Sequence, residues 1–147
     1  MSSNFDKQID KIKIKAEEKM LAVVKNAIRD VVIEAQTPVA KGGKMRVDTG
    51  FLRWSGTASL TGLPIGQTEG RKRKKGEIGV LAGYRYDENN GGKVLNDVLM
   101  HLKLGDKFYF GWTARYAQFR EMYDGFMSSA LANFQQHIEE QTRRLKK

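Results

Sequence analysis

The residues best able to do chemistry in this chain are five adjacent basic side chains in a glycine-rich segment, TEGRKRKKGEIG (68–79). Adjacent cations can contact several phosphate groups at once, and binding of that kind weakens steeply with salt. The run is not a phosphate-binding P-loop, because that motif needs Gly-Lys-Ser/Thr where this chain has Gly76-Glu77-Ile78. The candidate contact residues are Arg71, Lys72, Arg73, Lys74 and Lys75.

Charge alone leaves three interpretations of this run open. Proteins that read nucleic-acid sequence carry a recognition module, and the chain shows no helix-turn-helix signature, aromatic RNP motif or basic zipper. The run is therefore a solvated loop tip, a contact to nucleic acid without sequence specificity, or a contact to an acidic protein surface.

The sequence offers little for catalysis. Its two histidines, His101 and His137, occur singly, and neither an HExxH nor a GxSxG motif is present. The absence of cysteine excludes disulfides, thiolate zinc ligands and a cysteine nucleophile. We expect a protein that is not an enzyme and that holds no cofactor or metal. A catalytic alternative would need a pocket that brings one of the histidines near carboxylates.

Length and charge describe a basic protein of one domain. The chain has 147 residues and a net charge of +9, and residues 37–83 hold nine basic but only three acidic residues. Such a positive field favours polyanions or an acidic protein surface. No window approaches the roughly 18 apolar residues of a membrane span, and the N-terminus lacks the apolar run of a signal peptide. We expect a soluble single domain over 1–147, without a membrane partner.

The first segment has a helical period. Apolar residues recur at steps of three and four from Phe5 to Ala35, and no glycine or proline occurs before Pro38. A helix of about 30 residues would be roughly 45 Å long, which is long for so small a domain. It is either a single core helix with a solvated charged face, or one end projects or packs against another subunit.

The rest of the chain predicts a small antiparallel sheet and a final helix. Strand-forming stretches at 57–60 and 78–84 flank the basic segment, which predicts a long mobile loop at about 64–77. A β-hairpin is predicted over 98–112, with its turn at Gly105-Asp106. An amphipathic helix is predicted from Met127 to Leu145. The fold class is therefore α+β: a long N-terminal helix, a small antiparallel sheet with a β-hairpin and a long basic loop, and a C-terminal helix.

Two further stretches carry a resemblance to a known family. VDTGFLRWSG (47–56) resembles the DTG-x-L-R-x-S signature found early in the tail-completion, or neck, proteins of long-tailed bacteriophages. LGDKFYFGWTARYAQFRE (104–121) is similar to a later segment of the same proteins, in which a GD turn leads into an aromatic strand, then YA and a glutamate. The matching residues are Asp48, Thr49, Gly50, Leu52, Arg53 and Ser55 in the first stretch, and Gly105, Asp106, Tyr109, Tyr116, Ala117 and Glu121 in the second.

The resemblance implies a structural virion protein of the head–tail junction, made in the bacterial host cytoplasm. Such a protein completes the proximal end of the tail and joins it to the connector of the DNA-filled head. The implied assembly is a ring of six copies around the DNA channel. The implied partners are other copies of the chain, the connector or head-completion protein, the tail-tube or tail-terminator protein, and DNA in the channel. The alternative is a basic accessory protein that binds nucleic acid non-specifically.

The matched residues have structural roles in this interpretation. We expect Asp48 and Thr49 to cap a short helical turn, Gly50 to allow a tight backbone approach, and Arg53 to pair with an acid within or between subunits. Tyr116 and Glu121 are expected at core or interface positions.

Overall fold

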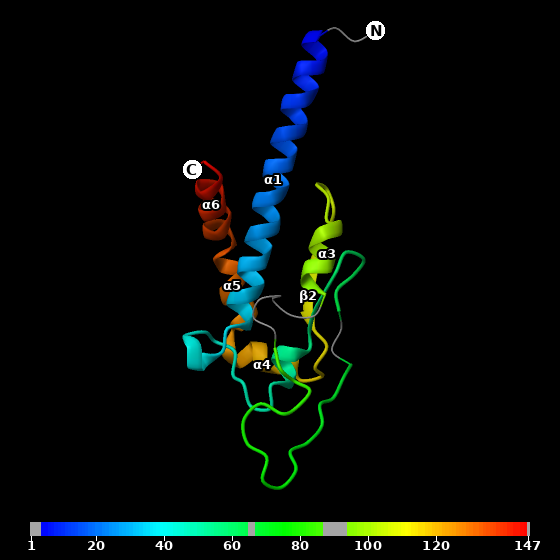
Figure 1. Ribbon diagram of the computed structural model, residues 1–147. Helices are drawn as coiled ribbons and strands as arrows, with labels where there is room; N and C mark the ends of the chain where they lie inside the picture. The colour runs from blue at the N-terminus through cyan, green and yellow to red at the C-terminus, as the bar shows by residue number, and fades with distance from the viewer. Residues whose placement is uncertain (1–3, 65–66, 87–93, 147) are drawn as a thin grey trace.

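The structure is a computed structural model that describes residues 4–64, 67–86 and 94–146. The last two helices of the chain lie along one side of the long N-terminal helix, and a short helix and the two-stranded sheet lie on its other side (Figure 1). In chain order the elements are α1 (Asn4–Gln36), the 3-10 turn η1 (Val39–Lys41), α2 (Phe51–Trp54), β1 (Gly56–Ser59), α3 (Leu95–His101), β2 (Tyr109–Trp112), α4 (Ala117–Asp124), α5 (Phe126–Ala132) and α6 (Phe134–Leu145). The α+β fold class is confirmed.

The long N-terminal helix is also confirmed, and only its second half lies within the body of the protein. Its buried residues begin at Val23, whereas every residue from Asn4 to Met20 is exposed. The second half packs against α5 and α6 on one side and faces α3 and the sheet on the other (Figure 1). The first half projects beyond these elements, because no other part of the described chain extends that far.

The sheet is antiparallel, but its two strands come from distant parts of the sequence. Gly56 of β1 pairs with Trp112 of β2, and Ser59 pairs with Tyr109. The predicted strand at 57–60 therefore corresponds closely to β1, and its partner is the aromatic segment that resembles the phage family.

The predicted hairpin over 98–112 is wrong in its first arm, which is helical. Leu95, Leu99 and Leu102 are spaced at four and three residues and are all buried in one cluster with Val32 of α1. That helical burial prevails over the period-two pattern, because an extended arm would separate these leucines onto both faces. The predicted turn does form: Gly105 has φ +94°, and the Asp106 carboxylate accepts the N–H of Lys103 at 2.9 Å. It joins a helix to a strand.

Two other expectations need correction. Residues 78–84 form no strand, because Gly79 and Gly83 have φ values of +69° and +93°, which a β-strand does not allow. Leu81 turns inward there and is 2% exposed, and the half-buried Tyr84 packs against the core, with its ring 5.0 Å from that of Phe51. The predicted C-terminal helix is divided at Asn133 into α5 and α6.

The core lies where α1, α2, β2 and α5 meet. Trp112 is at its centre: its ring packs edge-on against Phe126 at 4.9 Å between centroids, and its Nε1 donates to Gln36 Oε1 at 2.9 Å. No helix in the described part of the chain is long and apolar enough to cross a membrane.

Candidate functional site

The first family-like stretch forms a tight turn that leads into α2. Gly50 has φ +90°, and a Cβ atom added there would lie 2.8 Å from Val80 Cγ1 and 3.1 Å from the carbonyl oxygen of Tyr84. The expected close backbone approach at Gly50 is therefore confirmed. Glycine is required on both counts, since an L side chain would be strained at this φ and would collide with its neighbours.

Only one of the two predicted capping residues contributes to the turn. The Thr49 hydroxyl accepts the N–H of Phe51 at 3.3 Å. The Asp48 carboxylate instead accepts a hydrogen bond from Arg73 Nη2 at 2.8 Å, and no side-chain cap joins it to α2. The prediction that Asp48 caps the turn is thus wrong, because an arginine from the basic segment takes up its carboxylate.

Arg53, for which we expected an acid partner, ties the motif to α1. Its Nε donates to the carbonyl oxygen of Gln36 at 2.7 Å, and its guanidinium lies 4.0 Å from the centre of the Tyr86 ring. The carbonyl is at the C-terminal end of α1, where helix carbonyls lack intrahelical partners. Arg53 therefore stabilises both the end of α1 and the following turn.

Ser55 joins the first family-like stretch to the second. Its hydroxyl donates to the Leu52 carbonyl at 2.8 Å and accepts the N–H of Ala114 at 3.1 Å, and its own carbonyl accepts the N–H of Thr113 at 3.1 Å. Tyr116 then precedes α4, with its ring 6.4 Å from that of Phe51. The two stretches are about 60 residues apart in sequence, yet they fold into one unit.

Glu121 has a role that its position in the motif did not reveal. Its carboxylate accepts the backbone N–H groups of Met127 at 2.8 Å and Ser128 at 2.9 Å. These donors belong to the first turn of α5, where N–H groups have no intrahelical acceptor and a negative charge is favourable. Ala117 is half-buried at the start of α4 and packs against the core.

The basic run separates into two kinds of residue. Arg71 makes a two-pronged ion pair with Glu77, with N–O distances of 2.8 and 2.9 Å. Arg73 donates from Nη2 to both the carbonyl and the carboxylate of Asp48. Arginine suits these positions, because its planar guanidinium presents several donors in a fixed fork. Both arginines hold the loop in place.

Glu77 organises the tip of this loop. Its carboxylate also accepts the N–H of Lys74 at 2.7 Å. The Arg71 hydrogen bond, followed by that of the Lys74 N–H, lowers the pKa of Glu77 to about 2. The carboxylate is therefore charged at any physiological pH.

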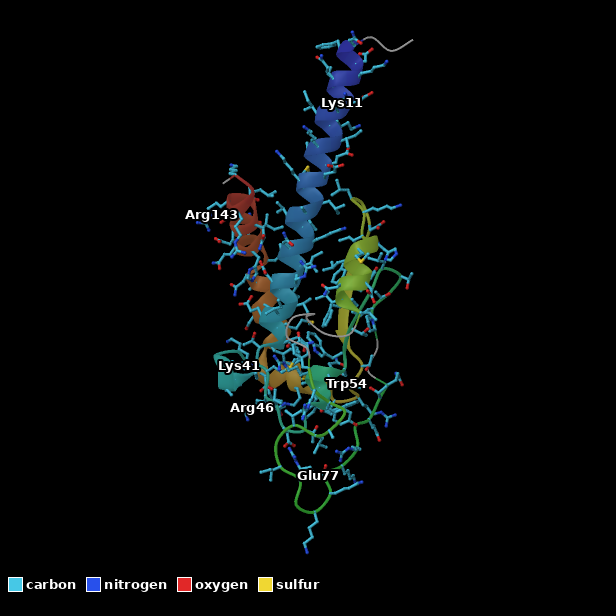
Figure 2. The ribbon with its side chains drawn as sticks, viewed as in Figure 1. Lys11, Lys41, Arg46, Trp54, Glu77 and Arg143 are labelled. Carbon is cyan, nitrogen blue, oxygen red and sulfur yellow. The ribbon has the colours of Figure 1, made fainter. Side chains whose placement is uncertain are left out.

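The three lysines of the run have the opposite arrangement. Lys72, Lys74 and Lys75 are exposed, and their ammonium groups form no hydrogen bond or ion pair with the described residues. They lie in the loop that carries Glu77, at the end of the molecule opposite the projecting half of α1 (Figure 2). Of the five predicted contact residues, these three are the ones available to a partner.

A pocket of about 730 Å³ lies between the motif turn and the basic loop. It brings together nine of the residues selected from the sequence: Asp48, Thr49, Gly50, Leu52, Arg53, Arg71, Lys72, Arg73 and Tyr116. The selected residues Ser55, Lys74, Lys75, Ala117 and Glu121 do not line it. Burial raises the pKa of the Tyr116 hydroxyl at its wall.

Sequence reasoning missed two arginines of this pocket. Arg46 and Arg120 line it as well. Both contact the Asp124 carboxylate, at 3.5 Å from Arg46 Nε and 2.8 Å from Arg120 Nη2. Of the two, the Arg120–Asp124 pair had a signal in the sequence, because residues four apart on a helix are neighbours.

The histidines do not form a catalytic site with the pocket. His101 ends α3 and its Nδ1 lies 2.8 Å from the Asp97 carbonyl oxygen. His137 of α6 lies near carboxylates, with Nε2 2.9 Å from Glu34 Oε2. This contact joins α6 to α1. The described residues contain no cluster of three or more His, Asp or Glu side chains suited to a metal ion.

The site and its fold define an α+β protein in which a basic pocket and loop lie at one end and a bare helix at the other. No family model, curated protein or solved structure matches the chain.

Proposed function

We propose that this chain is a structural protein of the phage head–tail junction, which completes the proximal end of the tail and joins it to the connector of the filled head. The proposal depends on the two family-like stretches, and one observation carries it. The two short matches fold into one unit, in which Ser55 bonds to Thr113 and Ala114 and the Tyr116 ring approaches Phe51. Two stretches that belong to one family signature are expected to pack together, and these two do so.

The exposed surfaces support an assembly protein. The projecting half of α1 carries Phe5, Ile9 and Ile12, which are 69%, 47% and 68% exposed. The outer face of α4 carries Phe119, Met122 and Tyr123, which are 62%, 76% and 71% exposed. Large apolar surfaces of this kind mark protein–protein contacts. A ring of six copies with further contacts to the connector and to the tail tube would cover both.

The basic loop has a place in the same proposal. It lies at the end of the molecule opposite the projecting helix (Figure 1). In a ring around the genome, its three lysines would face either DNA phosphates in the channel or an acidic rim of the connector or tube.

The test is electron microscopy of particles produced when the gene is deleted. Full heads beside separate, otherwise complete tails would support the proposal, and a plasmid copy of the gene should restore joined particles. Intact infectious virions from the deletion would overturn it.

The exposed lysines favour a second candidate function, a basic accessory protein that binds nucleic acid non-specifically. It predicts that the purified chain binds duplex DNA in a salt-dependent way. Replacing Lys72, Lys74 and Lys75 with Ala should lower the slope of log K against log salt by about 0.9 for each lost phosphate contact. If the chain shows no DNA binding at low salt, this candidate is eliminated.

A further inference from the structure

The projecting half of α1 keeps the apolar pattern of the half that is buried. Val23 and Ala27 are buried on one face of the helix. Phe5, Ile9 and Ile12 lie on that same face, because steps of three and four residues return to one side of a helix. Met20 continues the stripe and is 58% exposed. Figure 2 shows the side chains around Lys11 pointing into open space, with no other part of the chain beside them.

The same chain carries an apolar groove beside the buried half of α1. The groove measures about 290 Å³, and its wall is formed by side chains of α1, β2, α5 and the start of α6. A second hollow of about 390 Å³ adjoins it and shares Leu63, Phe110, Trp112 and Met127 with it. Leu131 and Met127 of α5 line the groove and are 56% and 37% exposed.

The helix cannot fill its own groove. α1 is continuous from Asn4 to Gln36, and its residues Ile28, Val31 and Val32 line the groove. Ile12 is 19 residues from Val31, which is about 28 Å along a helix axis. The stripe and the groove of one copy are therefore held apart, and the stripe can reach only the groove of another copy.

We propose that the projecting half of α1 docks, through Phe5, Ile9 and Ile12, into the groove of the next copy of the chain. Anchors at i, i+4 and i+7 in an apolar groove are the usual way in which a helix binds a protein surface. The contact is heterologous, because stripe and groove are different surfaces, so its repetition produces a closed ring or an open filament. The ring outcome rests on the proposed function; the contact itself does not.

The size of the contact predicts weak association of two isolated copies. Residues 4–20 make a segment about 25 Å long and about 10 Å wide, of which a groove covers about half. That buries roughly 800 Å² over both partners, below the 1,200–2,000 Å² of a stable complex. Dilute protein should be largely monomeric, and ring closure, which gives every copy two such contacts, should be needed for a stable assembly.

A disulfide trap tests the contact, and the natural chain contains no cysteine to interfere. One preparation carries Ile9→Cys in the stripe and another carries Leu131→Cys in the groove. The matched control replaces Ile9→Cys with Ile14→Cys, which is 54% exposed and lies on the opposite face of the same helix segment. The two preparations of each pair are mixed, oxidised and separated on a non-reducing gel.

We expect a disulfide-linked dimer from Ile9→Cys with Leu131→Cys and its loss with Ile14→Cys. Equal cross-linking of both pairs, or of neither, overturns the proposal. So does preferential linking of Ile9→Cys to itself, because the stripe would then pair with a second stripe. Sedimentation of Ile12→Asp and Ile14→Asp gives an independent measurement: only Ile12→Asp should reduce self-association at high concentration.

Failure of this inference is distinguishable from failure of the proposed function. Unjoined heads and tails in the gene deletion, without the specific cross-link, would leave the neck function standing and remove the docking mode. The specific cross-link with infectious deletion virions would do the reverse.

Discussion

Gly50 shows how a single residue of the motif is fixed by its surroundings. It combines φ +90° with a close approach to Val80 and Tyr84. Gly50→Ala should therefore destabilise the protein by about 2–4 kcal/mol, from left-handed backbone strain and from crowding. Gly42→Ala is the matched control: Gly42 has φ +89° but no atom within 4 Å of an added Cβ, so it should cost only about 1–2 kcal/mol. Urea unfolding measures both, and equal losses would remove the argument for close approach.

Glu77 is a residue whose contribution depends on pH. Its folded-state pKa of about 2 is below the ordinary glutamate value of about 4.3. A depressed pKa means that the folded state favours the charged form, so the stabilisation is complete above the unfolded pKa and is lost as pH falls through the folded pKa. Wild type should thus be more stable than Glu77→Gln at pH 6, and the difference should shrink between about pH 4.5 and 2. Unfolding curves across that range test it; a difference independent of pH would contradict the ion pair with Arg71.

At the scale of elements, Glu121 connects α4 to α5 by accepting two N–H groups of the α5 first turn. Glu121→Ala should cost about 1 kcal/mol, the usual effect of removing a cap. Glu139 has an exposed carboxylate on α6, so Glu139→Ala serves as the control. Its free energy of unfolding should stay within about 0.5 kcal/mol of the wild-type value. Thermal unfolding of the two variants decides the matter, and indistinguishable midpoints would mean that the cap is not needed.

The elements that could be predicted are those determined by local pattern. α1 has an uninterrupted apolar period over 33 residues, which only a helix satisfies. The hairpin prediction was wrong in its first arm because Leu102 fits both a period of two and a helical spacing. Only the contact of α3 with α1 decides between strand and helix there. The prediction of a strand at 78–84 was wrong because Gly79 and Gly83 adopt positive φ values. Glycine allows such values, but its presence in the sequence does not show that they occur.

The sequence predicted which residues belong to the candidate site better than it predicted how they are arranged. Most of the first family-like stretch, Tyr116 of the second and part of the basic run meet around one pocket. That meeting depends on contacts between distant segments, such as Ser55 with Ala114. The sequence also does not reveal how the basic run divides: it makes Arg73 one of five equivalent candidate contacts, whereas in the fold Arg73 holds Asp48. Charge type alone does not reveal which cations are used internally.

Across the whole molecule, the residues that stabilise the fold and the residues proposed for assembly lie in different parts of the chain. Residues 4–20 of α1 are exposed throughout, so their apolar side chains contribute little to the fold of one copy, although they dominate one of its surfaces. The free energy of unfolding of a chain that lacks residues 1–18 should lie within about 1 kcal/mol of that of the full chain, because only exposed helix is lost. Under the proposed function, the same truncation should act in the virion like loss of the gene, since the removed segment carries the stripe that is proposed to contact the next copy.

Complementation of the gene deletion measures this separation directly. We expect the truncated chain to accumulate as folded protein while electron microscopy shows full heads and unjoined tails. The matched variant is full length with Ile14→Asp, which alters the opposite face of the same segment and should restore joined particles. If the truncated chain restores joining, α1 projects for another reason, and the contacts of the proposed ring must be sought on the exposed face of α4. If the truncated chain is unfolded, the exposed half of α1 contributes to stability, and the proposed division of the molecule is wrong.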